Sequence, residues 1–143
     1  MRAALDLAQE CVAHGDVPVG AIVVGPTGEV IGRGRNQREE LGYPTAHAEV
    51  VAIRAAAAHL GGWRLDDCTL VVTLEPCTMC AGAIQSARVA RVVYGASEPR
   101  TGAAGSLWDV LRDRRLLHQV EVLPDVMAAE SAALLSDFFQ DRR

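Results

Sequence analysis

Residues 73–80 read Thr-Leu-Glu-Pro-Cys-Thr-Met-Cys, and residues 45–49 upstream read Thr-Ala-His-Ala-Glu. Together they place a His-x-Glu pair ahead of a Pro-Cys-x-x-Cys motif. Zinc takes imidazole nitrogen and thiolate sulfur ligands in a tetrahedron, and a catalytic site leaves one position to water. His47, Cys77 and Cys80 therefore supply three ligands for one zinc ion per subunit. Glu49 is not needed as a ligand and stays free to move protons.

The chemistry of such a site follows from the ion and the acid beside it. Bound zinc lowers the pKa of a water molecule towards neutrality, and a neighbouring carboxylate can carry the proton to a substrate. Each half of the motif is weak alone, because a Cys-x-x-Cys can be a redox pair or half of a zinc knuckle. A His-x-Glu pair alone is commonly helix surface. Their conjunction is the signature of zinc nucleobase deaminases, and it predicts catalytic zinc.

The cysteine motif lies between two predicted strands. Residues 69–74 form a continuous apolar run, which is typical of a central strand. Pro76 fits the first turn of a helix, and a helix there puts Cys77 and Cys80 one turn apart on one face. Residues 89–95 form the next strand, so strand, helix and strand make a right-handed crossover.

The histidine motif opens another predicted helix. Thr45 can cap it, and Gly61 stops it after about residue 60. Residues two apart on a helix point in different directions, so His47 and Glu49 can serve one site only at the helix tip. The buried stripe of this helix is predicted to consist of four apolar residues: Val50, Ile53, Ala57 and Leu60.

The rest of the chain supplies further helices and strands around these motifs. Residues 2–14 predict an amphipathic helix with Ala4, Ala8, Cys11 and Val12 on one face, ended by Gly15. Strands at 19–24 and 29–35 make a hairpin, and residues 36–44 are irregular. A helical turn at 107–111, a strand at 119–123 and a final helix from Asp125 to Gln140 complete the chain. The expected fold is a three-layer α/β/α domain over residues 1–143 with a five-stranded mixed sheet.

Composition points to the cytoplasm and leaves a nucleic-acid partner open. The net charge is −4 and the pI is about 5.5, which argues mildly against nucleic acid. All 14 basic residues are arginine, whose planar fork binds phosphate and stacks on bases. Several cluster, although residues 112–115 could equally form an acid-balanced, solvated surface. No apolar run could span a membrane, no signal peptide is visible, and four cysteines with two on a metal indicate a reducing compartment.

The whole chain resembles the bacterial tRNA-specific adenosine deaminases of the cytidine-deaminase-like superfamily. The zinc motifs, within 44–49 and 73–83, are shared across that superfamily. Residues 101–106 and 134–139 are closer to the tRNA branch, and residues 17–21 also match. The resemblance implies hydrolytic deamination of adenosine to inosine at the wobble position of a tRNA anticodon. It also implies binding of the anticodon arm and a homodimer in which the partner borders each active site.

Residue by residue, the resemblance implies His47, Cys77 and Cys80 as zinc ligands and Glu49 as proton shuttle. Asn36 is expected to hydrogen-bond the flipped base. The other expected substrate contacts are the pocket walls Val19 and Leu74, the loop residues Glu98 and Arg100, and Phe139 as a platform for neighbouring bases. Glu98 stands where the family pattern has a shorter Asp beside the ribose.

Several alternatives stay open from the sequence. Asn36 could merely end the hairpin, and Val19 and Leu74 could be plain core. Phe138 and Phe139 face different ways on a helix, so one is expected in the core and the other free to stack. A deaminase of a free base or nucleoside, such as guanine or cytosine, would use the same zinc chemistry. A structural zinc module that binds RNA without catalysis would need a fourth ligand, for which Cys68 is the candidate.

Overall fold

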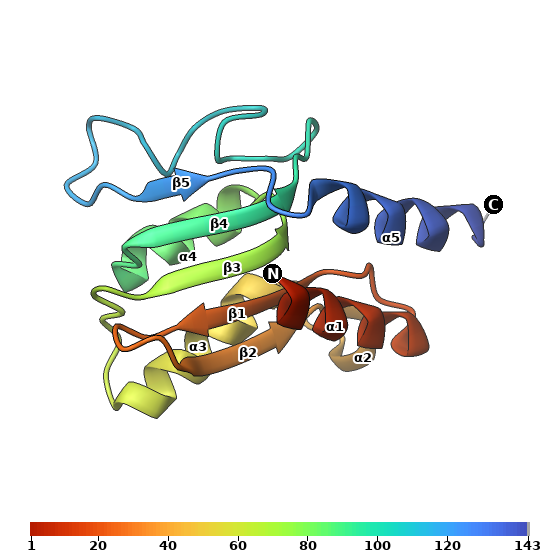
Figure 1. The fold of residues 1–143 in the computed structure, drawn as a ribbon, viewed down its shortest axis with the longest axis horizontal. Helices are drawn as coiled ribbons and strands as arrows, with labels where there is room; N and C mark the ends of the chain where they lie inside the picture. Colours follow the sequence, from red (N-terminus) through yellow and green to blue (C-terminus); the bar gives the residue numbers. More distant parts are fainter. Residues whose placement is uncertain (143) are drawn as a thin grey trace.

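The computed structural model describes residues 1–142 and builds a five-stranded sheet with helices on both faces (Figure 1). The strands are β1 (Gly20–Val24), β2 (Val30–Arg35), β3 (Thr69–Leu74), β4 (Arg91–Ala96) and β5 (Glu121–Leu123). The helices are α1 (Arg2–Glu10), α2 (Arg38–Leu41), α3 (Ala48–Leu60), α4 (Thr78–Ala87) and α5 (Ala128–Gln140), with a 3₁₀ turn η1 (Cys11–His14) after α1. The predicted three-layer fold is confirmed.

The sheet is mixed and has β3 at its centre, in the order β2-β1-β3-β4-β5. β1 runs antiparallel to both β2 and β3, whereas β3, β4 and β5 are parallel. The inner four residues of β3 are buried on both faces, as its continuous apolar sequence predicts. The parallel connection from β3 to β4 passes through α4, which is the predicted crossover.

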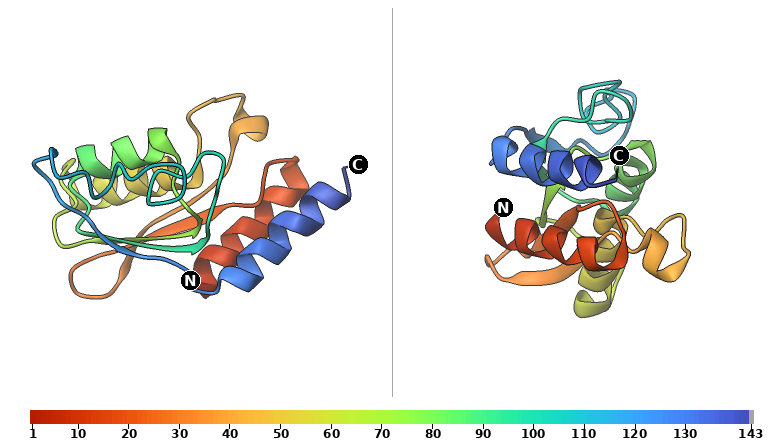
Figure 2. Two further views of the ribbon diagram at one scale, coloured as in Figure 1. Left: turned by 90° about the horizontal axis from the view of Figure 1, so that it is seen from above. Right: turned by 90° about the vertical axis from the view of Figure 1, so that its right-hand side faces the viewer.

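The two faces of the sheet carry different helices (Figure 2): α3 and α4 cover one, and α1 and α5 cover the other. The main core lies under α3 and α4, where side chains of all four longer strands meet. These include Val23, Leu70, Val72 and Val92, which are paired across the sheet and have no exposed surface. No helix within residues 1–142 is long and apolar enough to cross a bilayer.

Helix α3 approaches the sheet closely because both surfaces lack bulky side chains. A Cβ atom on Gly34 would lie 2.3 Å from the carbonyl oxygen of Ala48, and one on Gly32 would lie 2.4 Å from that of Ala52. The buried residues of α3 are accordingly Ala48, Glu49, Ala52, Ile53 and Ala56. The predicted stripe is confirmed at Ile53, which is buried, and at Ala57, which is half-buried against the core. It was wrong at Leu60, which is 47% exposed, because small residues rather than large ones face the strands.

Several helix starts also differ from the sequence prediction. His47, and not Thr45, is the N-cap of α3, and Cys77 is the N-cap of α4, so Pro76 precedes that helix. The final helix begins at Ala128 with Met127 as N-cap rather than Asp125. In each case the chain enters the helix two or three residues later than cap preference suggests, because the preceding residues are bonded to other parts of the fold.

Two segments between the elements differ as well. Residues 36–44, expected to be irregular, contain the short helix α2. Residues 107–111, expected to form a helical turn, instead bond back to residues 102–105. The first helix behaves as predicted, with Ala4, Ala8 and Cys11 buried and Gly15 left-handed at its end, but Val12 is 48% exposed.

Candidate active site

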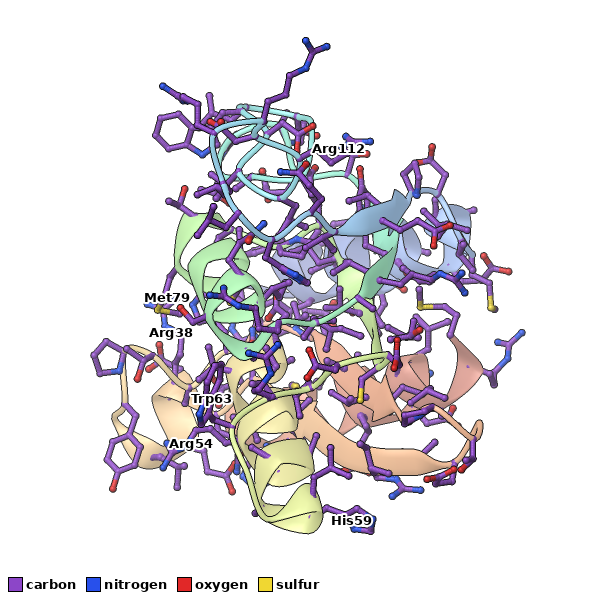
Figure 3. All side chains as sticks on the ribbon, turned by 90° about the vertical axis from the view of Figure 1, so that its left-hand side faces the viewer. Arg38, Arg54, His59, Trp63, Met79 and Arg112 are labelled. Atoms are coloured by element: carbon purple, nitrogen blue, oxygen red, sulfur yellow. The ribbon has the colours of Figure 1, made fainter. Side chains whose placement is uncertain are left out.

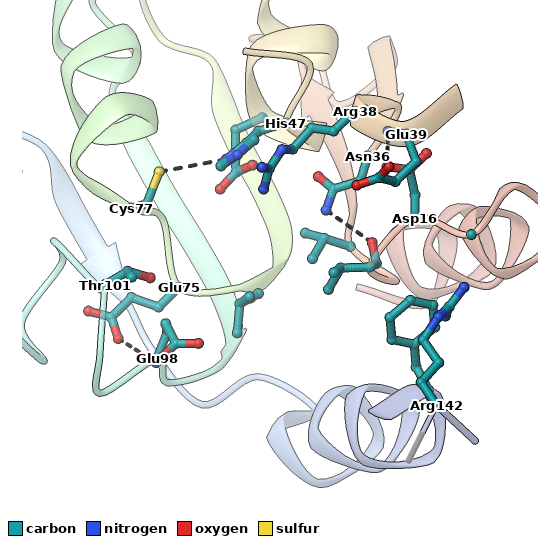
Figure 4. A pocket seen from close by; sticks show the side chains of 16 residues that line it. Asp16, Asn36, Arg38, Glu39, His47, Glu75, Cys77, Glu98, Thr101 and Arg142 are labelled. Carbon is teal, nitrogen blue, oxygen red and sulfur yellow. Dashed lines mark hydrogen bonds between the residues drawn. The ribbon is translucent and has the colours of Figure 1, made fainter. Parts of the chain in front are cut away.

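A cleft of about 330 Å³ opens where the carboxyl ends of β2, β3 and β4 meet the first residues of α3 and α4 (Figure 4). This is the end of an open α/β sheet at which ligands usually bind, and the volume suits a small molecule or a single base. The cleft is lined by both motifs and by parts of the chain far from them: Gly15, Asp16, Val17, Val19, Asn36, Arg38, Glu39, His47, Glu49, Leu74, Glu75, Cys77, Glu98, Thr101, Phe138 and Arg142.

His47, Cys77 and Cys80 converge at one side of this cleft. The Nδ1 atom of His47 lies 3.6 Å from the sulfur of Cys77 and 3.5 Å from that of Cys80. All three ligand atoms lie within 4.8 Å of one another. A tetrahedral zinc with bonds of about 2.0–2.1 Å to nitrogen and about 2.3 Å to sulfur separates those two atoms by roughly 3.6 Å. The three side chains therefore fit zinc, and Nδ1 is the nitrogen that faces the sulfurs.

No fourth protein ligand joins this set within residues 1–142. Cys68, the candidate for a closed structural site, is buried elsewhere and its thiol donates to the carbonyl of Asp66 at 3.5 Å. A three-ligand set leaves one position for solvent, which is the arrangement of a catalytic site.

Two of the ligands are placed by the same local device. His47 and Cys77 are the N-cap residues of α3 and α4, and both have extended backbone conformations. Neither side chain caps its own helix, so each is free to point into the space between the two helix ends. Cys80 lies one turn into α4 and completes the set from inside the fold.

The hydrogen bonds within the ligand set favour the thiolate form of Cys77. The hydrogen bond from the Cys80 thiol, with a further one from His47, lowers the pKa of Cys77 to about 4. The same contact with Cys77, together with burial, raises the pKa of Cys80, and contact with Cys77 raises the pKa of His47. The three groups thus share protons among themselves, and a bound cation would displace those protons.

Glu49 is the buried acid of the site. It is the second residue of α3, is 4% exposed and lines the cleft. Burial raises the pKa of its carboxyl to about 7, and a cation beside it would lower that value by attraction. A carboxyl that exchanges its proton near neutral pH is suited to general acid and base catalysis.

Asn36 occupies the space between the start of α3 and the loop before β1. Its Nδ2 donates to the carbonyl of Val17 at 3.0 Å, and its Oδ1 accepts from the Ala48 amide at 3.0 Å. Asn36 therefore caps α3 in place of His47. One N–H and one lone pair of the amide remain after these two bonds, and Asn36 lines the cleft.

The other predicted substrate contacts fall into two groups. Val19, Leu74 and Glu98 line the cleft. Arg100 and Phe139 are outside the lining; Arg100 is exposed and Phe139 is 49% exposed on α5. Of the two adjacent phenylalanines, Phe138 is the buried one and reaches the cleft, where Arg142 stacks 3.8 Å from its ring centre.

Sequence reasoning did not single out several residues that the fold brings to the cleft. Asp16 is 2% exposed and accepts from the Glu39 and Glu40 amides, so it fixes the start of α2. Arg38 and Arg142 place cations in the lining. Arg38 belongs to one of the arginine clusters of the sequence, formed by Arg33, Arg35 and Arg38. Nothing local marks Asp16, because its partners are more than twenty residues away.

Glu75 is the most heavily bonded of these residues. Burial by itself would raise the pKa of its carboxyl, but hydrogen bonds from Ser106, Glu98 and Ala104 outweigh it and lower the pKa. Glu75 directly precedes the Pro-Cys-x-x-Cys motif, and that position was the one signal available from the sequence.

Known proteins share both the site and the fold. A family model described as the cytidine and deoxycytidylate deaminase zinc-binding region matches residues 1–96. A tRNA-specific adenosine deaminase of Streptococcus pyogenes is 46% identical over 143 residues, covering 100% of this chain and 89% of that protein.

Solved structures give the same result. One from studies of A-to-I editing by tRNA:A34 deaminases is 42% identical, with a TM-score of 0.90 over 94% of this chain and 97% of that one. A guanine deaminase from Nitrosomonas europaea is 26% identical, with a TM-score of 0.80 over 96% of this chain and 81% of the other. This chain therefore belongs to the family of the tRNA-specific adenosine deaminases, among the proteins that carry the cytidine and deoxycytidylate deaminase zinc-binding region.

Proposed function

We propose that this protein catalyses the hydrolytic deamination of adenosine to inosine at the wobble position of a tRNA anticodon. The observation that carries the proposal is the meeting of three zinc-compatible ligands and one buried carboxyl in a base-sized cleft. The substrate class follows from the full-length similarity to tRNA-specific adenosine deaminases.

The reaction adds water across the N1–C6 bond of adenine and expels the 6-amino group as ammonia. His47, Cys77 and Cys80 would hold the zinc ion, which supplies Lewis-acid activation of the water. Glu49 takes a proton from the water and delivers it to N1. It then takes the proton of the new C6 hydroxyl and gives it to the departing amine, which leaves as ammonia. Its burial beside the ligands keeps bulk water from competing for these transfers.

The base must leave its stack to reach these groups. The free N–H and lone pair of Asn36 are suited to the edge of the flipped base, and Val19 and Leu74 line the same cleft. We expect Glu98, which lines the cleft, to contact the ribose, and the exposed residues Arg100 and Phe139 to contact neighbouring nucleotides. Arg38 and Arg142 supply two cations to a lining that also holds carboxylates, and we expect these arginines to meet the phosphates of the anticodon arm.

We further propose a homodimer whose interface includes the outer side of α3 and α4. Large apolar side chains are exposed there, and Figure 3 shows Met79 and Trp63 on one side of the molecule together with Arg54. Tyr43 and Trp63 are each 60% exposed, and Leu41 is 47% exposed. Sedimentation equilibrium should give twice the chain mass, and a mass equal to one chain would exclude the dimer.

Residues 1–143 would act as a single domain in the cytoplasm, where tRNA is found.

The decisive experiment incubates the purified protein with an anticodon stem-loop carrying adenine at the wobble position. Inosine should form there, and the same stem-loop with adenine moved to another loop position should stay unmodified. Absence of inosine with zinc-loaded protein would exclude the proposal.

A deaminase of a free base is the second candidate, favoured by the similarity to the guanine deaminase from Nitrosomonas europaea. The zinc site would serve both reactions. Parallel assays with the stem-loop, guanine, cytosine and adenosine separate them, because ammonia released from a free base without inosine in the stem-loop would select this candidate.

A further inference from the structure

The carboxylate of Glu75 holds a long loop in place beside the cysteine motif. It is 2% exposed and accepts hydrogen bonds from the amides of Glu98 at 2.9 Å, Ala104 at 3.1 Å and Ser106 at 3.0 Å. The hydroxyl of Ser106 donates to it as well. One side chain thus collects three backbone donors and one hydroxyl from residues 98–106, which we call the rim loop.

The rim loop also runs close against the backbone on either side of Glu75. The Ala103 amide donates to the carbonyl of Pro76 at 2.8 Å, and Gly102 pairs with Cys77 in an isolated bridge. A Cβ atom on Gly102 would lie 2.4 Å from the carboxyl carbon of Glu75. Only a glycine at position 102 lets the loop pass directly over the carboxylate.

The rim loop contributes directly to the cleft, through Glu98 and Thr101. It contains no helix and only single-residue bridges, so it has no ladder of its own to fix its shape. Glu98 additionally accepts from the Arg100 amide at 2.8 Å, which closes the turn that begins the loop. Backbone hydrogen bonds to Pro76 and to residues 107–110 hold part of the loop, and Glu75 supplies the side-chain contacts that hold Glu98, Ala104 and Ser106.

We propose that Glu75 is a positioning residue that sets the substrate-binding wall of the cleft, by fastening the rim loop to the segment that carries Cys77. The identity of the substrate in this proposal rests on the proposed function, whereas the fastening of the rim loop by Glu75 does not. Glu75 also lines the cleft, but its two carboxylate oxygens are occupied by the four donors of the rim loop. It acts through Glu98 and Thr101.

The chemistry of the side chain explains why a carboxylate is needed. An ionised carboxylate only accepts, on two oxygens, whereas an amide replaces one oxygen by a donor. In Glu75, Oε1 faces the amides of Ala104 and Ser106, and Oε2 faces the Glu98 amide. A glutamine would therefore set its NH₂ group against at least one backbone N–H in either orientation, which frees that part of the loop.

The test compares the full-length zinc-loaded protein with Glu75→Gln, using hydrogen exchange, zinc content and kinetics on the anticodon stem-loop. Amides of residues 98–106 should exchange at least about tenfold faster, while those of β3 and α4 should keep their rates. Zinc should stay at one ion per chain. KM should rise about tenfold and kcat should change less than about threefold, since the loss is of substrate binding.

The matched control is Glu121→Gln, the same change at an exposed carboxylate paired with Arg91. It should leave exchange, zinc content and both kinetic constants unchanged. Ser106→Ala removes one of the four donors and should give a smaller effect of the same kind. This second variant keeps the test decisive if Glu75→Gln does not fold.

Faster hydrogen exchange throughout the core, or loss of zinc, in Glu75→Gln or Ser106→Ala would make Glu75 a general structural residue and overturn the proposal. So would unchanged exchange of the rim loop in both variants. If the wild-type protein forms no inosine, the proposed function fails, and the exchange data still decide whether Glu75 fastens the loop. An unchanged KM with a loosened loop would overturn the role in substrate binding alone.

Discussion

Among single residues, Glu49 combines deep burial with a place beside the metal ligands. It is 4% exposed, yet it lines the cleft from the second position of α3. Burying a carboxyl without a charged partner favours its neutral form, so it can hold a proton at neutral pH. Glu75, the other buried glutamate of the site, instead has its carboxylate held by four hydrogen-bond donors.

Replacing Glu49 by alanine should leave zinc bound and lower kcat by about 10²–10⁴-fold, because the proton carrier is lost but the ligands remain. Metal analysis and single-turnover formation of inosine measure the two effects. Turnover close to the wild-type rate would remove Glu49 from the mechanism.

Ser131, unlike Glu49, carries a buried polar group that lies outside the cleft and has no hydrogen-bond partner in the described part of the chain. Its Oγ is the buried side-chain atom without a hydrogen-bond partner among residues 1–142, and it faces Gly95 of β4. Ser131→Ala should keep the free energy of unfolding unchanged or raise it by up to about 1 kcal/mol, because an unpaired hydroxyl is removed.

Urea unfolding measures this change, with Ser136→Ala on the same helix as the exposed control. The control should stay within about 0.5 kcal/mol of the wild type. A clear loss of stability in Ser131→Ala alone would reveal a partner for the hydroxyl.

The metal ligands could be read from the sequence because each belongs to a short motif whose residue types have few other uses together. The capping of α3 by Asn36 and the fastening of the rim loop by Glu75 could not be predicted from the sequence. Their partners, Ala48 and Val17 for one and residues 98–106 for the other, are brought near only by the fold. Phe138 reaches the cleft rather than Phe139 because α5 packs on β4, which helix periodicity alone cannot orient.

Among the elements, α3 is the one whose position the site depends on most. It carries His47 and Glu49 at its start and lies directly on Gly32 and Gly34 of β2. Its hydrophobic stripe was predicted only in part, because Leu60 is exposed and small residues face the strands. Strand positions were predicted well, since β1, β3 and β4 have apolar runs and β2 follows a hairpin turn, whereas helix starts depended on long-range bonds.

Gly34→Ala should displace the start of α3, because the new methyl would lie 2.3 Å from the Ala48 oxygen and 2.5 Å from the Ala52 nitrogen. Backbone atoms cannot rotate aside, so we expect about 1–3 kcal/mol of destabilisation. Zinc affinity should fall with it. Thermal unfolding and zinc titration measure both.

Gly62→Ala is the matched control, because a methyl there meets nothing within 4 Å. It should unfold like the wild type and keep its zinc. Equal melting temperatures and zinc affinities of the two variants would mean that the contact with β2 does not set the position of α3.

On the scale of the whole molecule, the ligand set joins two separately built units. His47 comes from the unit formed by β1, β2 and α3, and the cysteines come from β3, α4 and β4. The antiparallel and parallel parts of the sheet meet between them. The sequence predicted both units and their order along the chain, but it could not supply their relative placement, because that depends on the pairing of β1 with β3.

Removing zinc with a chelator should abolish activity and lower the melting temperature. An ion that binds only the folded state adds about 4 kcal/mol when its free concentration is about 1,000 times its Kd. Differential scanning calorimetry before and after dialysis measures the shift. Added zinc should restore both properties, and a melting curve indifferent to the metal would contradict this bridging role.

The depth of the ligands has a consequence for metal exchange. Cys80 has no exposed surface, while His47 and Cys77 are half-buried and line the cleft. We therefore expect an ion to leave through the cleft, where a nucleotide would bind. RNA bound in the cleft should therefore slow the loss of zinc, so chelators should remove the metal more slowly from the RNA-bound enzyme than from the free enzyme.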